Sequence, residues 1–181
     1  FELEDESKTK VNVFISKSGH QKLANLLASY GTLSGGDMDE KIATDVLGSI
    51  QFFKGLIGPI PLNELQVTEI PYTHGQAFPG LIHLSFVNYQ GIMDDMADEL
   101  FRAHEVAHQW WGIGVNFDTY HDQWLSEGFA EYSALWFVQA AFQDNEMFFK
   151  VLDKWKDEIF GNRKYLFSSG QQAGPLWLGS R

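Results

Sequence analysis

His104-Glu105-Val106-Ala107-His108 is the stretch that decides the fold and the chemistry of this 181-residue chain. Histidines four residues apart on an α-helix lie on one face, with Cβ atoms roughly 5–6 Å apart. Both imidazoles can then reach a single tetrahedral Zn²⁺ at about 2.0–2.1 Å. The carboxylate of Glu105 stands beside the first histidine, where it reaches a metal-bound water instead of the metal. The stretch therefore predicts one zinc ion, with His104 and His108 as ligands and Glu105 as the group that activates water.

The flanking sequence predicts that this stretch lies near the end of a mostly buried helix. Residues 93–103 place acidic side chains in a first turn and apolar side chains at helical spacing, with Asp94 as the expected N-cap. Trp110, Trp111 and Gly112 follow and indicate the end of the helix. The alternative is a chance match on a solvated helix face. Buried histidines without a metal would need other polar partners, so zinc binding is the favoured interpretation.

Glu127 is the predicted third ligand. It opens a second apolar helix, expected to run to about Phe142, and eighteen residues lie between His108 and Glu127. That length lets the chain leave one helix, turn, and bring a second helix alongside the first. The fourth zinc position then stays open for water or substrate, which is typical of catalytic zinc sites and not of structural ones. The motif is therefore interpreted as a metallohydrolase site.

Two further acidic residues are candidates for supporting roles. Glu131 lies one turn after Glu127, where it can accept the second N–H of a ligating histidine; the alternative is a solvated carboxylate. Asp122 is either such a supporting group or a helix cap. Ser126 is the other candidate cap for this helix.

Two motifs, residues 104–112 and residues 124–130, resemble the gluzincin aminopeptidases of the alanyl aminopeptidase family. The Trp-Trp-Gly and Trp-Leu-x-Glu-Gly-Phe-Ala flanks and the spacing between the motifs separate them from thermolysin-like endopeptidases and metzincins. Weaker similarity extends from about residue 40 to residues 174–176. The resemblance implies an α+β, mostly helical, thermolysin-like zincin catalytic domain. It also implies that His104, His108 and Glu127 bind zinc and that Glu105 is the general base.

The chain departs from that family in the segment expected to bind substrate. Family members carry Gly-Ala-Met-Glu-Asn before the zinc helix, and the Glu binds the α-amino group of the substrate. Alignment on residues 79–82 places residues 74–78 there, with Ala77 in place of the Glu. Ala77 cannot bind an ammonium group by charge, which keeps an endopeptidase open as an alternative. The main chain of Gly75 and Gln76 is expected to pair with an extended peptide as an added strand.

A second departure concerns a tyrosine that stabilises the oxyanion in family members, just before a Lys-Gly pair. Tyr165 lacks that context. We therefore expect a thermolysin-like domain that is truncated at its C-terminus.

Composition limits the remaining classes. The net charge of −11 argues against nucleic-acid binding, and the absence of cysteine excludes disulfides and thiolate ligands. No apolar run reaches the 18 or more residues of a transmembrane helix. Residues 1–10 are acidic and are expected to connect to a preceding domain, and residues 11–181 to form part of the catalytic domain. Further domains of the same protein are expected as partners.

Hydrophobic periodicity predicts the other elements. Strands are expected over residues 11–15, 65–70 and 81–86, and helices over residues 20–30, 37–57 and 144–159, the last closed by Gly161. The helix before Gly58 carries a core stripe, which comprises Ile42, Val46, Ile50, Phe53 and Ile57.

The sequence thus predicts a zinc metallopeptidase that takes peptide substrates and removes N-terminal residues. Two alternatives remain open. One is an endopeptidase or another hydrolase that uses the same zinc site. The other is a zinc-stabilised scaffold that keeps the peptidase fold without its chemistry.

Overall fold

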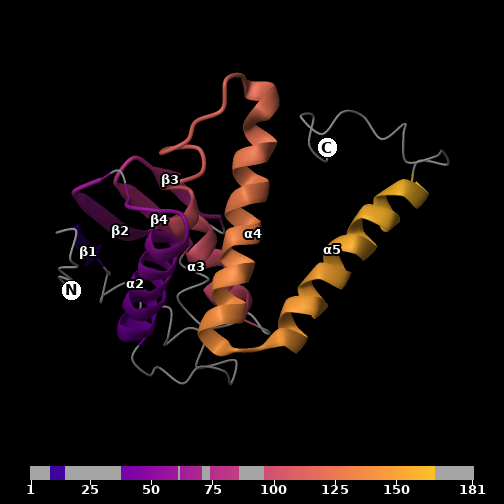
Figure 1. Ribbon diagram of the computed structural model, residues 1–181, viewed down its shortest axis with the longest axis horizontal. Helices are drawn as coiled ribbons and strands as arrows, with labels where there is room; N and C mark the ends of the chain where they lie inside the picture. The colour runs from indigo at the N-terminus through magenta and orange to yellow at the C-terminus, as the bar shows by residue number, and fades with distance from the viewer. Residues whose placement is uncertain (1–8, 15–37, 61, 71–73, 86–95, 166–181) are drawn as a thin grey trace.

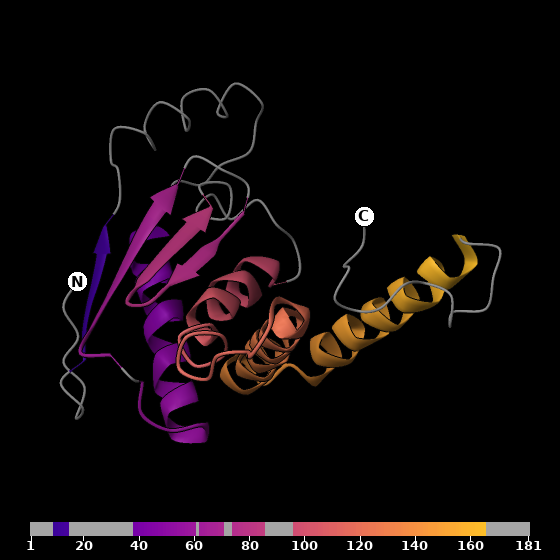
Figure 2. The same ribbon diagram turned by 90° about the horizontal axis from the view of Figure 1, so that it is seen from above.

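The computed structural model describes residues 9–14, 38–60, 62–70, 74–85 and 96–165. Within these ranges the chain has a mixed α+β, mostly helical fold, as predicted. Its elements are β1 (Lys10–Phe14), α2 (Met38–Leu56), β2 (Glu64–Ile70), β3 (Gln76–Phe78), β4 (Leu81–Ser85), α3 (Ala97–Ala107), the short 3₁₀ helix η2 (Tyr120–Asp122), α4 (Gln123–Phe142) and α5 (Asn145–Tyr165). Figures 1 and 2 show the sheet at one side, α2 and α3 against it, α4 beyond α3, and α5 extending away from the rest.

The sheet has the strand order β1-β2-β4-β3. Strands β1, β2 and β4 run parallel, while β3 pairs antiparallel with β4, so that Ala77 lies opposite Ile82. Alternate residues of β2 are buried, including Leu65 and Val67, because successive side chains of a strand point to opposite faces. Among the described residues, β3 forms one edge of this sheet, and the backbone groups of an edge strand can pair with a further strand.

The core lies between this sheet, α2 and α3. The predicted stripe of α2 is confirmed at Ile42, Val46, Ile50 and Phe53, which are all buried, whereas Ile57 follows the end of the helix and is only partly buried. Helix α2 ends before Gly58, whose φ of 126° favours glycine.

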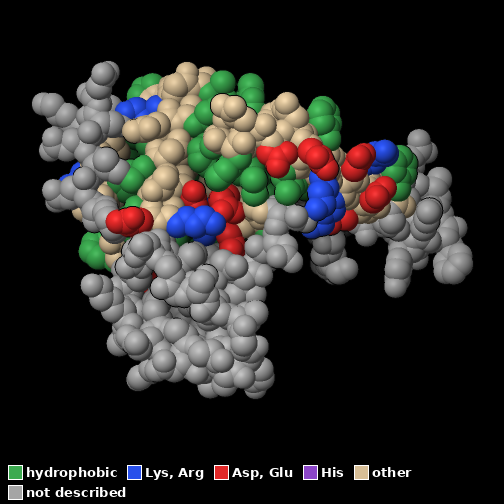
Figure 3. Space-filling view, turned by 90° about the horizontal axis from the view of Figure 1, so that it is seen from below, with side chains coloured by type: hydrophobic (Ala, Val, Ile, Leu, Met, Phe, Trp, Pro, Cys, Tyr) green, Lys and Arg blue, Asp and Glu red, His purple; other side chains and the backbone are tan. Residues whose placement is uncertain are grey.

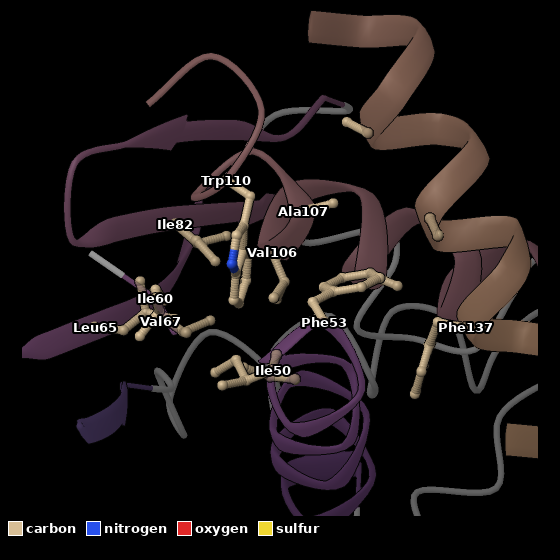
Figure 4. Packing of buried hydrophobic residues seen from close by; sticks show 14 of the residues in the cluster. Ile50, Phe53, Ile60, Leu65, Val67, Ile82, Val106, Ala107, Trp110 and Phe137 are labelled. Carbon is tan, nitrogen blue, oxygen red and sulfur yellow. The ribbon is translucent and has the colours of Figure 1, made fainter. Parts of the chain in front are cut away.

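Helix α3 rests on the same core (Figure 4). Val106 and Trp110 reach toward α2, and the rings of Phe53 and Trp110 meet edge to face at 5.6 Å. The indole N–H of Trp110 donates to the carbonyl of Gly58 at 3.0 Å. The helix that carries the zinc motif is therefore fixed to the core along its length.

A buried ion-pair network also joins α2 to α3. Arg102, only 1% exposed, donates from Nε to Asp45 Oδ2 at 2.9 Å, and its Nη2 lies 2.7 Å from the same oxygen. Glu99 Oε1 lies 3.7 Å from Arg102 Nη2, and the Glu99 carboxylate also forms an ion pair with Lys41. Burial raises the pKa of Asp45, although Arg102 opposes the shift. Burial acts in the same direction on Glu99, but its hydrogen bonds, including the one from Lys41, together with the charges of Lys41 and Arg102 outweigh burial and lower the pKa of Glu99.

Two predicted boundaries were wrong. Helix α3 begins at Ala97 after Met96, whose φ is 57°, so Asp94 is not its N-cap. Helix α5 continues through Gly161 to Tyr165, although its predicted start is confirmed by the bond from the Met147 N–H to Asp144 Oδ1. The expected helix over residues 20–30, the acidic residues 1–8 and residues 174–176 lie outside the described ranges.

The described surface of α5 carries charges of both signs. Figure 3 shows acidic and basic side chains interspersed along the part of the surface formed by this helix. Among the described residues, no helix combines the length and the apolar character needed to cross a membrane.

Candidate metal centre

The structure brings the three predicted ligands together from two neighbouring helices. His104 lies in the last turn of α3 and His108 is its C-cap, while Glu127 lies in the second turn of α4. Helices α3 and α4 lie side by side (Figures 1 and 2). The His104 and His108 Nε2 atoms are 3.0 Å apart, and Glu127 Oε2 lies 3.5 Å from the first and 3.4 Å from the second.

This triangle of donor atoms fits a zinc ion. Ligand atoms held at 2.0–2.1 Å from a tetrahedral centre lie about 3.3 Å from one another. The three observed separations, 3.0, 3.4 and 3.5 Å, bracket that value. A cavity of about 360 Å³ opens beside the three side chains, where a fourth ligand would enter.

The hydrogen bonds of the two Nδ1 atoms favour a cation between the two Nε2 atoms. His104 Nδ1 lies 2.7 Å from Glu131 Oε2, and His108 Nδ1 lies 3.0 Å from the carbonyl of Trp111. Because both Nδ1 atoms face acceptors, they carry the protons, and the Nε2 lone pairs point at each other. Two lone pairs 3.0 Å apart repel unless a cation lies between them. The predicted contact of Glu131 with a histidine is confirmed.

The pKa values of the metal-free site also show that a positive charge is favoured between these donor atoms. Burial lowers the pKa of His104, but the hydrogen bonds to Glu127 and Glu131 outweigh burial and raise it to about 9. Hydrogen bonds from His104 and His108 hold the pKa of Glu127 well below its usual range. In the absence of metal, a proton therefore takes the place of the ion between the donors.

Ser126 has a role at the site that the sequence did not reveal. Its hydroxyl donates to the Trp111 carbonyl at 2.9 Å and lies 3.3 Å from His108 Nδ1. A side chain at Gly112, whose φ is 101°, would collide with this hydroxyl. Its place between Trp124 and Glu127 was the signal in the sequence, but the prediction that Ser126 caps this helix is wrong, because α4 begins at Gln123. Asp122 occupies the N-cap position of α4, but its side chain makes no capping hydrogen bond to that helix; its carboxylate instead accepts hydrogen bonds from the backbone and side chain of Thr119 at the start of η2.

Glu105 lines the same cavity as the two histidines and is only 5% exposed. Burial raises the pKa of its carboxyl, against the lowering influence of the histidines. Gly75 packs so closely that a Cβ atom there would overlap the Glu105 carboxylate and the Phe101 ring. A carboxylate with a raised pKa beside a metal position is suited to accept a proton and return it.

The residues predicted to bind substrate also line this cavity. Gly75 and Gln76 border it together with Ala77, and all three belong to or adjoin the edge strand β3. Contact of these residues with a substrate stays a prediction. Glu105 and Glu127 are the only acidic side chains among the described residues that line the cavity.

Known proteins resemble the chain in sequence and in fold. Residues 89–164 match the Peptidase family M1 domain. Aminopeptidase O of Mus musculus is 32% identical over 78 residues, which are 41% of this chain and 9% of that protein. Aminopeptidase M1-B of Oryza sativa subsp. japonica is 28% identical over 124 residues, 63% of this chain and 14% of that protein.

The crystal structure of an M1 zinc metallopeptidase from Deinococcus radiodurans has the same fold, with a TM-score of 0.53 at 19% identity. The similarity covers 86% of this chain and 30% of that one, so the chain spans less than a third of the proteins it matches here. The fold is that of a metallopeptidase. The family match and the relatives confirm the resemblance to the gluzincins of the alanyl aminopeptidase family, family M1.

Proposed function

We propose that this protein is a zinc metallopeptidase that hydrolyses peptide bonds and removes N-terminal residues. One observation carries the proposal: the Nε2 atoms of His104 and His108 face each other at 3.0 Å beside Glu127, in a cavity that also contains the Glu105 carboxylate. The family match and the names of the relatives support peptide substrates.

The residues divide the chemistry among them. Zinc held by His104, His108 and Glu127 would lower the pKa of a coordinated water toward about 7 and polarise the scissile carbonyl. Glu105 takes a proton from the attacking water and passes it to the leaving amine. Glu131 fixes the ring of His104 through its Nδ1 proton, so that the Nε2 lone pair stays directed at the metal position.

The edge strand β3 is proposed to hold the substrate main chain. A peptide that pairs with the free edge of β3 would lie along the cavity wall formed by Gly75 and Gln76. Main-chain pairing does not depend on side chains, so it serves peptides of varied sequence.

An endopeptidase is the second candidate, and the lining of the cavity favours it. Ala77 borders the cavity, and the two acidic side chains among the described lining residues, Glu105 and Glu127, are assigned to catalysis and metal binding. A substrate ammonium group therefore finds no other carboxylate there. A scaffold without activity is the third candidate, and Glu105 argues against it, because a binding protein has no need for a buried general base.

The deciding experiment offers the zinc-loaded full-length protein one mixture of peptides with free and N-acetylated termini, read by mass spectrometry. The Glu105→Gln variant serves as the control. We expect stepwise loss of N-terminal residues from free peptides only. Internal cuts, or cleavage of acetylated peptides, would establish the endopeptidase. Absence of cleavage that depends on Glu105 would leave the scaffold.

A further inference from the structure

Gln109 is a fully buried glutamine that directly follows His108. Its side-chain amide makes two hydrogen bonds to the turn between β3 and β4. Nε2 donates to the carbonyl of Phe78 at 3.1 Å, and Oε1 accepts the Gly80 N–H at 3.1 Å. Both the donor and the acceptor of the Gln109 amide thereby link the end of the zinc helix to the turn.

This turn is also fixed on its sheet side. The Gly80 carbonyl accepts the Gln66 N–H at 2.8 Å. The φ of Gly80 is 73°, and a Cβ there would come within 3.2 Å of the Glu64 carbonyl. The turn therefore has a defined conformation, and the backbone groups to which Gln109 binds are fixed in place.

The opposite end of β3 meets the same helix. Gly75, just before β3, packs against Phe101 and Glu105 without room for a Cβ atom. Phe101, Glu105 and Gln109 are spaced four residues apart, so they follow one side of the helix and its C-terminal turn. Strand β3 is thus held against the zinc helix at both of its ends.

We propose that Gln109 is a positioning residue, which holds β3 at a fixed place relative to Glu105 and thereby sets where an extended peptide lies over the metal site. The inference rests on the proposed function in one respect, the pairing of substrate with β3. A peptide added to the edge of β3 moves with that strand. A displacement of about 1 Å at the reacting atoms can cost on the order of a hundredfold in rate.

Gln109→Met tests the role, because methionine has a similar length and makes neither hydrogen bond. We expect kcat for a free hexapeptide to fall roughly ten- to hundredfold, while kcat for a single-residue anilide, which has little main chain to pair with β3, changes less than about threefold. Zinc affinity stays within about twofold, since the three ligands are untouched. Gln109→Glu keeps the acceptor for Gly80 and loses the donor to Phe78. Its kcat for the hexapeptide should therefore lie between those of the wild type and Gln109→Met.

Gln139→Met is the matched control. Gln139 also joins two elements through its amide, by donating to Asn145 Oδ1 at 2.7 Å, but this bond links α4 to α5 and involves neither β3 nor the zinc helix. This variant keeps wild-type kinetics for both substrates. A merely structural role of Gln109 would lower the folded fraction and reduce both activities equally. Equal loss for both substrates, no loss, or weakened zinc binding would each overturn the proposal.

Hydrogen exchange separates this inference from the proposed function. In the zinc-loaded full-length protein, Gln109→Met should speed exchange of the amides from Gln76 to Leu81 and leave those of α2 unchanged. Wild-type protein that cleaves no peptide would refute the proposed function, whereas unchanged exchange in β3 would refute the role of Gln109. The two failures are therefore distinct.

Discussion

The facing nitrogens of His104 and His108 determine what the site does at the scale of single residues. Their Nδ1 atoms are committed to Glu131 and to the Trp111 carbonyl, so the lone pairs of both Nε2 atoms converge on one point. A proton or a metal ion relieves the repulsion between them. Metal binding and proton binding are consequently in competition.

This competition predicts proton release on zinc binding. The pKa of His104 is raised from 6.5 to about 9, so metal-free protein keeps the His104 proton at pH 7 and loses it as the pH rises through 9. The stabilisation from this proton is fully present below pH 6.5 and lost through pH 9. Zinc binding at pH 7 should release about one proton from this site, measured by calorimetry in buffers of different ionisation enthalpy. Equal binding heats in all buffers would contradict this.

Gly75 illustrates how a residue without a side chain can control a reactive one. In Gly75→Ala the new methyl group overlaps the Glu105 carboxylate and the Phe101 ring, so the base must move. We expect kcat to fall at least about tenfold with zinc content unchanged. Gly55→Ala is the control, because a Cβ at Gly55 meets no atom within 4 Å. Wild-type kcat in Gly75→Ala would show that Glu105 tolerates the shift.

At the scale of elements, the Arg102–Asp45 pair fastens α3 to α2. Removing one partner leaves the other buried and uncompensated, so Arg102→Met should lower the free energy of unfolding by about 3–5 kcal/mol. The double variant Arg102→Met, Asp45→Leu should recover much of that loss, since it removes both charges of the pair, while Glu99 keeps its ion pair with Lys41. Urea unfolding of the zinc-loaded protein measures both. A double variant no more stable than Arg102→Met would refute the pairing as the cause.

Sequence periodicity predicted the elements that are long enough to repeat an apolar pattern several times. Helix α2 was predicted by its apolar stripe, and α4 by the run that begins beside Glu127. Strand β3 was missed because three residues hold too little alternation to detect. Gly161 was taken as a helix end, but one glycine costs only about 1 kcal/mol inside a helix and α5 continues past it.

Within the site, the spacing of the motifs was enough to predict that the three candidate ligands converge, whereas the long-range contacts could not be predicted. His104, His108 and Glu127 converge as the two motifs implied. The Gln109 bonds to Phe78 and Gly80, however, span 31 and 29 residues. Such contacts depend on how the sheet meets the helix, which no local pattern encodes.

At the scale of the whole molecule, one face of α4 is apolar and exposed. Its large side chains follow helical spacing, and they are Leu125, Phe129, Tyr132 and Trp136, exposed by 37%, 51%, 48% and 43%. A stripe of this size is typical of an interface.

The central claim is that His104, His108 and Glu127 hold zinc while Glu105 moves the proton. Its most direct test measures bound zinc and peptide turnover together in the full-length protein and in the Glu105→Gln and His108→Ala variants. We predict that Glu105→Gln keeps its zinc and loses turnover by about 10²–10⁴, and that His108→Ala loses both. Turnover retained in Glu105→Gln, or zinc retained in His108→Ala at wild-type affinity, would contradict the claim.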